Sequence, residues 1–296
     1  MSGERREWRR LARTFYWQIR RELWEHRALW VAPLAVAAFA VIVHLGTSLT
    51  ASDAGRAAAL ADPARAGEFM THYSAMTGVT VVTGLVVGVL YSLGALQGER
   101  RDRSILFWKS LPVSDRMTVL SKAAVPLVVI PLIVFPIVVV ASGLMLGLQS
   151  LVWSLDGFDP RPLWARVDLP FLWLALLYGL PFMALWNAPF YAWMLLVSAW
   201  SRRVAFLWAA APFAAILMVE HLALHHTPAH WLLERRIGGG VLQPYSANGE
   251  GVVWIERLSD LDPARIYTLP GLWIGVLIAA GLLYAAIRIR RSRTPN

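Results

Sequence analysis

The side chains best suited to bind a metal ion lie together near the end of an apolar run. Glu220, His221 and His225 fall within six residues, and residues four apart share one face of a helix, so His221 and His225 are the best-spaced pair. His226 and His230 follow them. The segment lacks the H-E-x-x-H pattern of zinc hydrolases, and the chain has no cysteine. We interpret these residues as polar groups at a membrane surface, with a metal site as the alternative.

A second chemically notable residue is Asn187, a carboxamide deep inside another apolar run and close to Pro189. Polar groups inside a membrane are costly and therefore mark candidate functional positions. The Asn187 side chain is predicted either to brace a neighbouring helix near the proline or to contact a substrate. No G-x-x-x-x-G-K-[S/T] phosphate loop occurs in the sequence, so the chain is not expected to hydrolyse ATP in that way.

The elements that position these residues are long apolar runs. Of the 296 residues, 57% are hydrophobic and only 16% are charged. A helix of about 20 residues crosses the roughly 30 Å hydrocarbon layer of a bilayer. Six runs reach that length, which predicts an all-α polytopic membrane protein with spans at about 29–49, 74–97, 123–149, 169–200, 204–224 and 269–287.

Charge in the connecting segments alternates from one side of the predicted membrane to the other. The segment 1–28, the loop 98–122, the turn at residues 202–203 and the tail 288–296 together hold 20 Lys or Arg and seven Asp or Glu, whereas the other loops hold eight and twelve. Basic residues near spans stay on the cytoplasmic side. Both termini are therefore predicted to be cytoplasmic, in a bacterial-type cytoplasmic (inner) membrane, with 220–268 as an outer loop. The same placement explains the net charge of +9 without nucleic acid as a partner.

The segment before the first span has the pattern of an amphipathic helix. Apolar side chains recur every three or four residues, while most arginines fall on other faces. We predict that this helix lies in the interface of the lipid bilayer, and the alternative is a solvated helix packed on a partner. The apolar positions are Trp8, Leu11, Phe15, Ile19 and Leu23.

The loop 98–122 is too apolar in its middle for a simple solvated connection. Ser104 is placed to cap a short helix, and Pro112 ends it because the residue before a proline avoids helical geometry. Such a helix, flanked by charge, is predicted to dock on lipid or on another protein. Its apolar residues are Ile105, Leu106, Phe107, Trp108 and Leu111.

These residues also carry a family resemblance. Glu99-Arg100 and the string Ser-Leu-Pro-Val-Ser at 110–114 match the loop between spans two and three of type 2 ABC transporter permeases, and Lys122 follows at the family's spacing. The chain thus resembles the ABC-2-type permease family. It departs from the family pattern at Arg103-Ser104, where Gly-Thr is usual, at Leu106, where an acidic residue is common, and at Asp115, where Arg is common.

The resemblance implies a transmembrane permease subunit of an ATP-driven exporter. A separate ABC ATPase subunit would bind ATP and Mg, with no cofactor in this chain. A second permease chain, identical or a sister, would complete the substrate path, and the loop would act as a coupling helix on the ATPase. The alternatives are a six-span intramembrane metal-dependent enzyme and a non-transporting ABC-like subunit that signals or anchors. The coupling residues that the resemblance implies are Glu99, Arg100, Ser104, Ile105, Leu106, Phe107, Trp108, Leu111, Pro112 and Ser114.

Overall fold

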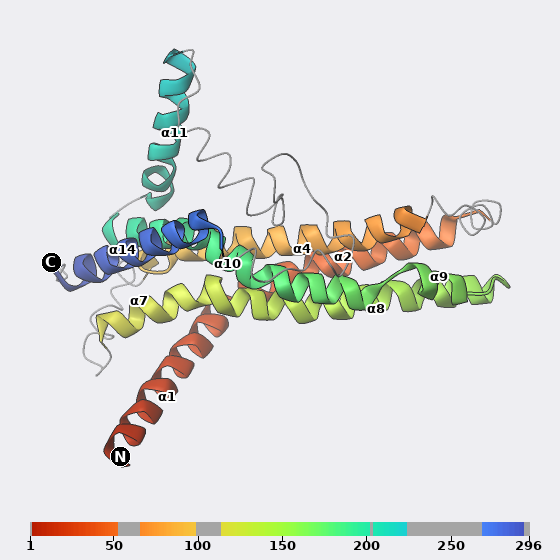
Figure 1. Ribbon diagram of the computed structural model, residues 1–296, viewed down its shortest axis with the longest axis horizontal. Helices are drawn as coiled ribbons and strands as arrows, with labels where there is room; N and C mark the ends of the chain where they lie inside the picture. Colours follow the sequence, from red (N-terminus) through yellow and green to blue (C-terminus); the bar gives the residue numbers. More distant parts are fainter. Residues whose placement is uncertain (1, 53–65, 99–113, 202–203, 224–267, 293–296) are drawn as a thin grey trace.

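The computed structural model describes residues 2–52, 66–98, 114–201, 204–223 and 268–292, and within these ranges the chain is helical, without strands (Figure 1). The long apolar runs of the sequence become long helices because every backbone polar group is then satisfied within its own segment. In chain order the elements are α1 (Ser2–Glu25), α2 (Ala28–Thr50), α4 (Ala66–Gly94), α7 (Asp115–Ala124), the π-helix η2 (Val125–Val129), α8 (Ile130–Leu155), α9 (Arg161–Arg166), α10 (Leu169–Trp200), α11 (Ala205–Ala223) and α14 (Pro270–Ser292).

Five helical stretches of the described chain are long and apolar enough to cross a membrane: Ala28–Thr50, Met70–Gly94, Asp115–Leu155, Arg161–Trp200 and Pro270–Ser292. The chain is thus all-helical with several apolar helices, as predicted for a multi-pass membrane protein. The predicted span 204–224 coincides with α11, which is not among the five.

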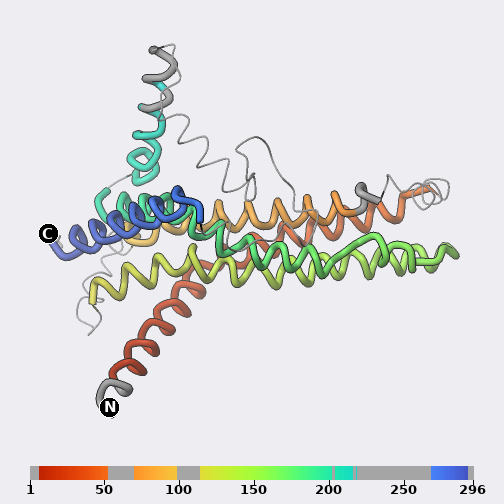
Figure 2. The backbone as a smooth tube through the Cα atoms, in the orientation of Figure 1, coloured from red at the N-terminus to blue at the C-terminus, as the bar shows by residue number. Residues whose placement is uncertain are grey.

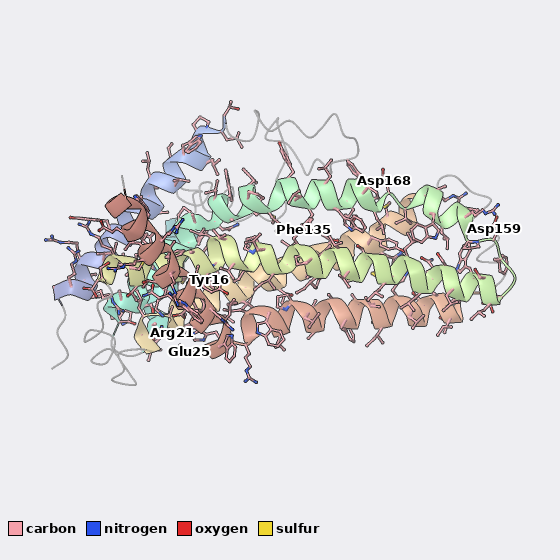
Figure 3. The ribbon with its side chains drawn as sticks, turned by 90° about the horizontal axis from the view of Figure 1, so that it is seen from below. Tyr16, Arg21, Glu25, Phe135, Asp159 and Asp168 are labelled. Atoms are coloured by element: carbon pink, nitrogen blue, oxygen red, sulfur yellow. The ribbon has the colours of Figure 1, made fainter. Side chains whose placement is uncertain are left out.

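The long helices lie side by side along the longest axis of the molecule, whereas α1 and α11 point away from the bundle (Figures 1 and 2). Helix α2 packs on α4 and α8, and α14 packs along α10. Two ends can therefore be distinguished. At the α7 end, α4, α10 and α14 finish and α7 begins, while at the α9 end α2 and α8 finish and α9 leads into α10. In Figure 3, Arg21 and Glu25 lie toward the α7 end, and Asp159 and Asp168 lie at the α9 end.

The third apolar stretch begins earlier than its hydropathy indicates. The sequence places the start of the span at 123, but the helix starts at Asp115, so residues 115–122 are helical rather than part of the loop. Ser114 explains this start, because its hydroxyl accepts a hydrogen bond from the Met117 backbone N–H at 3.2 Å and so caps the first turn. From there the helix continues to Leu155 without a break.

A five-residue π-helix interrupts the regular α-helical hydrogen bonding of this stretch. Pro126 and Pro131 cannot donate backbone hydrogen bonds, and the Ile130 N–H donates to the carbonyl of Val125, five residues back. These two prolines thus accompany one local change of helix type. Helix α4 approaches closely here, because a Cβ added at Gly84 would lie only 2.9 Å from Cγ2 of Val134.

Candidate functional site

The predicted coupling and metal residues fall on different parts of the chain. Ser114 is exposed and caps α7, Asn187 is buried in α10, and His221 belongs to α11. His225 lies outside the described residues. So do the coupling residues Glu99, Arg100, Ser104, Ile105, Leu106, Phe107, Trp108, Leu111 and Pro112.

The chain entering the predicted coupling segment is held by α10. The backbone N–H groups of Leu96 and Gln97 both donate to the hydroxyl of Ser198, each at 2.9 Å. Ser198 is fully buried, and Leu96 is 2% exposed. Two backbone donors that would be left without partners after α4 ends are therefore satisfied by one side chain of another helix, which fixes where the segment starts.

The chain leaving the segment is held by the last helix, α14. Asp115, the first residue of α7, accepts a hydrogen bond at 3.0 Å from Nε of Arg290. The Arg290 side chain is 5% exposed and that of Asp115 is 23% exposed, so water screens this pair only in part. Asp115 is also well placed for its charge, because a carboxylate in the first turn interacts favourably with the helix dipole.

Seven residues further along α7, Lys122 makes the most deeply buried ion pair of the described chain. Its Nζ donates to Oε1 of Glu22 at 2.8 Å, and the two side chains are 2% and 1% exposed. Glu22 lies on α1, which packs mainly against α7. Since seven residues make almost two helical turns, Asp115 and Lys122 lie near the same line along α7. One short helix is thereby fastened to both α14 and α1.

Three further groups surround the Glu22 carboxylate. Tyr91 of α4 donates its hydroxyl hydrogen to Oε2 at 2.9 Å, and Arg21 donates from Nη2 to Oε1 at 2.8 Å. Nε2 of His26 lies 3.6 Å from Oε2. Burial alone raises the pKa of Glu22, but the Lys122 ammonium, the Arg21 guanidinium and the hydrogen bonds from Lys122 and Tyr91 hold this pKa below its ordinary value. We call Glu22, Lys122, Tyr91, Arg21 and His26 the Glu22 junction.

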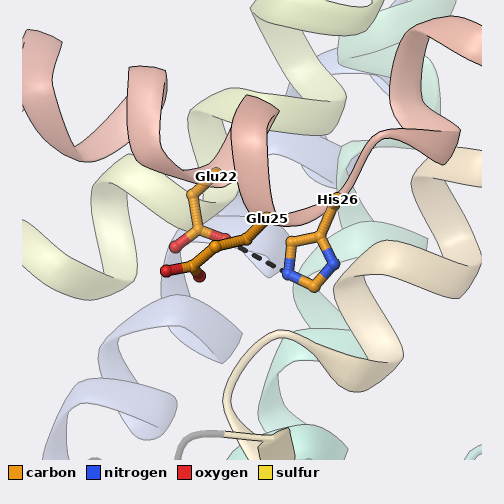
Figure 4. Close-up of side chains that lie close together, drawn as sticks. All are labelled: Glu22, Glu25 and His26. Carbon is orange, nitrogen blue, oxygen red and sulfur yellow. Dashed lines mark ion pairs between the residues drawn. The ribbon is translucent and has the colours of Figure 1, made fainter.

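Two residues of this junction, together with Glu25, have the spacing of a metal site. Glu22, Glu25 and His26 each offer a ligand atom within 4.8 Å of the others (Figure 4). However, Oε1 of Glu22 already accepts from Lys122 and from Arg21. Two fixed cations beside the carboxylate repel a divalent ion, and Oε2, the oxygen that faces His26, already accepts a hydrogen bond from Tyr91. The arrangement therefore joins helices and does not favour a metal.

The sequence pattern of α1 indicates that Glu22 is buried, although the prediction of an amphipathic helix did not use it. The predicted apolar stripe of α1 includes Phe15 and Ile19, and Glu22 falls three residues after Ile19 and seven after Phe15, on the same stripe. A glutamate on an apolar stripe needs a buried partner. The partner, Lys122, was singled out by the family spacing but not as a site residue.

The Asn187 side chain is hydrogen-bonded within its own helix, and its contact with a substrate stays a prediction. Its Nδ2 donates at 2.8 Å to the carbonyl of Met183, one turn back in the same helix. Pro189 follows it in α10. The carboxamide thus satisfies a carbonyl of its own helix, and no hydrogen bond from Asn187 to a neighbouring helix occurs among the described residues.

A second buried polar group lies toward the α9 end. Oε1 of Gln149, in α8, is 3.2 Å from Nε2 of His44 in α2 and accepts a hydrogen bond at 3.1 Å from the hydroxyl of Tyr73 in α4. All three side chains are buried, with exposures of 7% for Gln149 and His44 and 0% for Tyr73. We call these three residues the Gln149 cluster. It joins three helices without any formal charge of its own.

In comparisons with known proteins, no family model, no curated protein and no solved structure matches this chain.

Proposed function

We propose that this protein is the transmembrane permease subunit of an ATP-driven ABC exporter, forming the substrate path as a dimer. A separate ATPase subunit would bind ATP and Mg and would press on the segment between the second and third spans. The observation that carries the proposal is how the ends of this segment are held. The Ser-Leu-Pro-Val-Ser string ends at Ser114, and Ser114 caps a helix that continues from Asp115 to Leu155.

This arrangement suits a part that receives a mechanical input. The segment is anchored to α10 through Ser198 on one side and to α14 through Arg290 on the other. A force applied to it therefore acts on the bundle helices directly. The continuous helix that follows would carry displacement into the apolar region, and a closed ATPase dimer would shift the permease toward one state by binding that state more tightly.

The test is whether an ATPase binds through the proposed coupling helix. The full chain, tagged and expressed with its native neighbouring proteins, is purified in mild detergent and assayed for ATP hydrolysis, with Leu111 intact and with Leu111→Asp. Leu155→Asp is the matched control, because Leu155 is 78% exposed at the α9 end. We expect an ATPase to co-purify with the unmodified chain and with the control, and to be lost from Leu111→Asp.

Each other outcome has a definite meaning. If no ATPase accompanies the unmodified chain, the exporter proposal is wrong. If the ATPase binds and hydrolyses ATP but sealed vesicles show no transport, the chain is a non-transporting ABC-like subunit that signals or anchors.

The proposed topology has six spans, with α11 as the fifth and with the α7 end in the cytoplasm of a bacterial-type cell. The chain has no cysteine, so single cysteines report sidedness without background. Ser292→Cys and Ser154→Cys are conservative changes at exposed positions near the α7 end and the α9 end. A membrane-impermeant thiol reagent added to intact cells should label Ser154→Cys and leave Ser292→Cys unlabelled. The reverse pattern would overturn the proposed orientation.

A further inference from the structure

We propose that the outer face of α1 binds the anionic phosphate headgroups of phospholipids. This face carries three arginines and two tryptophans, which we call the Arg–Trp stripe: Arg10, Arg13, Trp17, Arg20 and Trp24. Lipid binding of this kind is independent of the exporter function, because it needs only a membrane and one face of one helix.

The stripe follows the period of an α-helix. Its members recur at alternating intervals of three and four residues within α1, so all five lie on nearly the same side of the helix. All five side chains are exposed, Trp17 at 49% and Trp24 at 71%. No aspartate or glutamate falls on the stripe, so this face is basic and aromatic throughout.

The opposite face of α1 is the one that meets the rest of the protein. Glu22 is buried, Phe15 and Ile19 are half-buried, and Leu23 packs against the core. Because Glu22 follows Trp17 by five residues, it lies about 140° further around the helix, and the stripe faces away from the bundle. Three residues of the apolar pattern that was predicted to meet lipid are thus covered at least in part by protein, and a different face of α1 remains for lipid.

The arginines of the stripe have no counter-charge in the part of the protein that the structure describes. Arg21, beside the stripe, forms an ion pair with Glu22. In contrast, no ion pair from Arg10, Arg13 or Arg20 occurs among the described residues. Like charges on one face repel each other, and a negative surface relieves that repulsion. An anionic bilayer supplies such a surface, because it attracts every arginine that lies near it.

Within the stripe, Arg20 is flanked by both tryptophans. Its guanidinium carbon lies 5.0 Å from the ring centroid of Trp17 and 5.6 Å from that of Trp24. These cation–π contacts hold the guanidinium beside the rings without using its N–H donors, which suit the oxygens of a phosphate. Indole rings are stabilised where apolar lipid chains meet the headgroups. Exposed tryptophans beside an arginine therefore favour a lipid surface over a soluble acidic protein.

The place of the stripe in the molecule matches the level of the headgroups. Trp24 lies four residues before Ala28, where the first of the membrane-length helices begins. Helix α1 leaves the bundle from that point, at the α7 end (Figure 1). Exposed Arg288 and Arg291 lie in the last turns of α14, at the same end. The stripe thus starts at the surface of the membrane and adds to a basic end of the bundle.

The test uses the full chain in lipid nanodiscs and needs no ATPase. Tyr16→Cys carries an environment-sensitive fluorophore, because Tyr16 is 58% exposed, adjoins Trp17 in the chain, and the sequence has no cysteine of its own. The lipids are phosphatidylcholine alone and phosphatidylcholine with increasing fractions of phosphatidylglycerol. We expect the emission to shift to the blue as the phosphatidylglycerol fraction rises, and to shift back as salt is added.

Variants of the labelled chain then assign the response to the stripe. Arg20→Gln should lower the ratio of membrane-bound to unbound α1 about fivefold, the usual contribution of one basic residue near an anionic surface. Arg20→Lys keeps the charge and should retain most of the dependence on phosphatidylglycerol. Arg116→Gln is the matched control, because Arg116 is an exposed arginine of α7 that lies outside the stripe. It should leave the ratio unchanged.

Two results would overturn the lipid site. An emission that is the same with and without phosphatidylglycerol would mean that the stripe does not bind anionic lipid. Equal losses for Arg20→Gln and Arg116→Gln would assign the response to the net charge of the protein instead of the stripe. Gel filtration of each variant identifies misfolded samples, and Arg20→Lys then decides in place of Arg20→Gln. Because no ATPase takes part, the lipid site and the exporter function stand or fall separately.

Discussion

Two buried polar groups of this protein join three helices each but differ in charge. The Glu22 junction, toward the α7 end, binds α1, α4 and α7 through a carboxylate, an ammonium and a guanidinium. The Gln149 cluster, toward the α9 end, binds α2, α4 and α8 through a carboxamide, an imidazole and a phenol. Helix α4 contributes a tyrosine hydroxyl to both.

The difference follows from where each group lies along the apolar helices. Glu22 belongs to a helix that leaves the bundle, and Lys122 lies just before the apolar run of the third span, so neither charge sits deep within an apolar stretch. Gln149 and His44 lie within apolar helices, where an isolated charge is costly and a neutral amide is far less so. Helices can thus be joined by charge where they emerge and by neutral hydrogen bonds further in.

The largest expected effect comes from removing one charge of the buried pair. Lys122→Met leaves the Glu22 carboxylate buried with its main cation missing, which should lower the free energy of unfolding by about 3 kcal/mol. Thermal unfolding in detergent, followed by the fluorescence of the 15 tryptophans, measures this. Arg116→Met, an exposed cation on the same helix, should change the midpoint little. Equal shifts of the unfolding midpoint for the two variants would mean that the buried ion pair stabilises the protein no more than an exposed cation does.

A smaller effect is expected at the neutral cluster. Gln149→Leu removes the acceptor shared by His44 and Tyr73 and should cost about 1 kcal/mol, since hydrogen bonds between membrane helices are worth only about that much. The same unfolding assay applies, with half-buried Gln97→Leu near the α7 end as the control. A loss as large as that of Lys122→Met would remove the energetic distinction between the two groups.

The ion pair between Asp115 and Arg290, whose carboxylate is partly exposed, should be weaker than the neutral cluster. Asp115→Asn retains the cap-like polarity at the start of α7 and loses the charge that pairs with Arg290, so a cost below about 1 kcal/mol is expected. Raising the salt concentration should shrink the difference between this variant and the parent. A difference that salt does not change would show that the pair is shielded from water.

The smallest effect concerns acidity. Because the pKa of folded Glu22 lies below its ordinary value of 4.5, the unfolded chain binds a proton first as the pH falls. The stability from the junction is therefore complete above about pH 4.5 and is lost as the pH drops toward the folded pKa. The groups that lie around this carboxylate are Arg21, Glu25, His26, Lys122 and Tyr91.

This dependence can be measured by comparing unfolding midpoints from pH 6 downward. Glu22→Gln should flatten the acidic decline relative to Glu25→Gln. Identical slopes for the two variants would assign the decline to other carboxylates.

The bounds of the long helices could be predicted from the sequence, but the contacts between the helices could not. The predicted spans 29–49 and 169–200 lie within one residue of α2 and α10, because charged residues bound these apolar runs. The start of α7 was missed, since hydropathy registers apolar residues and ignores a serine cap. Hydropathy also gives no reason to expect a π-helix, because it does not register how the backbone hydrogen bonds shift beside a proline.

The Glu22 junction lies beyond what pattern alone provides. Glu22 and Lys122 are 100 residues apart in the chain, so only the packing of α1 on α7 reveals them as partners. Likewise the Gln149 cluster assembles residues from three separate helices. In each case the polar residues are recognised as a group only once the structure shows which helices are neighbours.

The π-helix also has a consequence for rotational phase. The hydrogen bond of a π-helix spans five residues instead of four, so η2 contains one residue more than an α-helical turn would. Every residue before η2 is therefore rotated by about 100° about the helix axis, relative to an unbroken α-helix continued from α8. Asp115 and Lys122 face α14 and α1 in that rotated frame. Deleting one residue from Val125–Val129 would return the stretch to plain α-helix and turn both charges away from their partners. The extra residue thus aligns the charges of α7 with the helices that receive them.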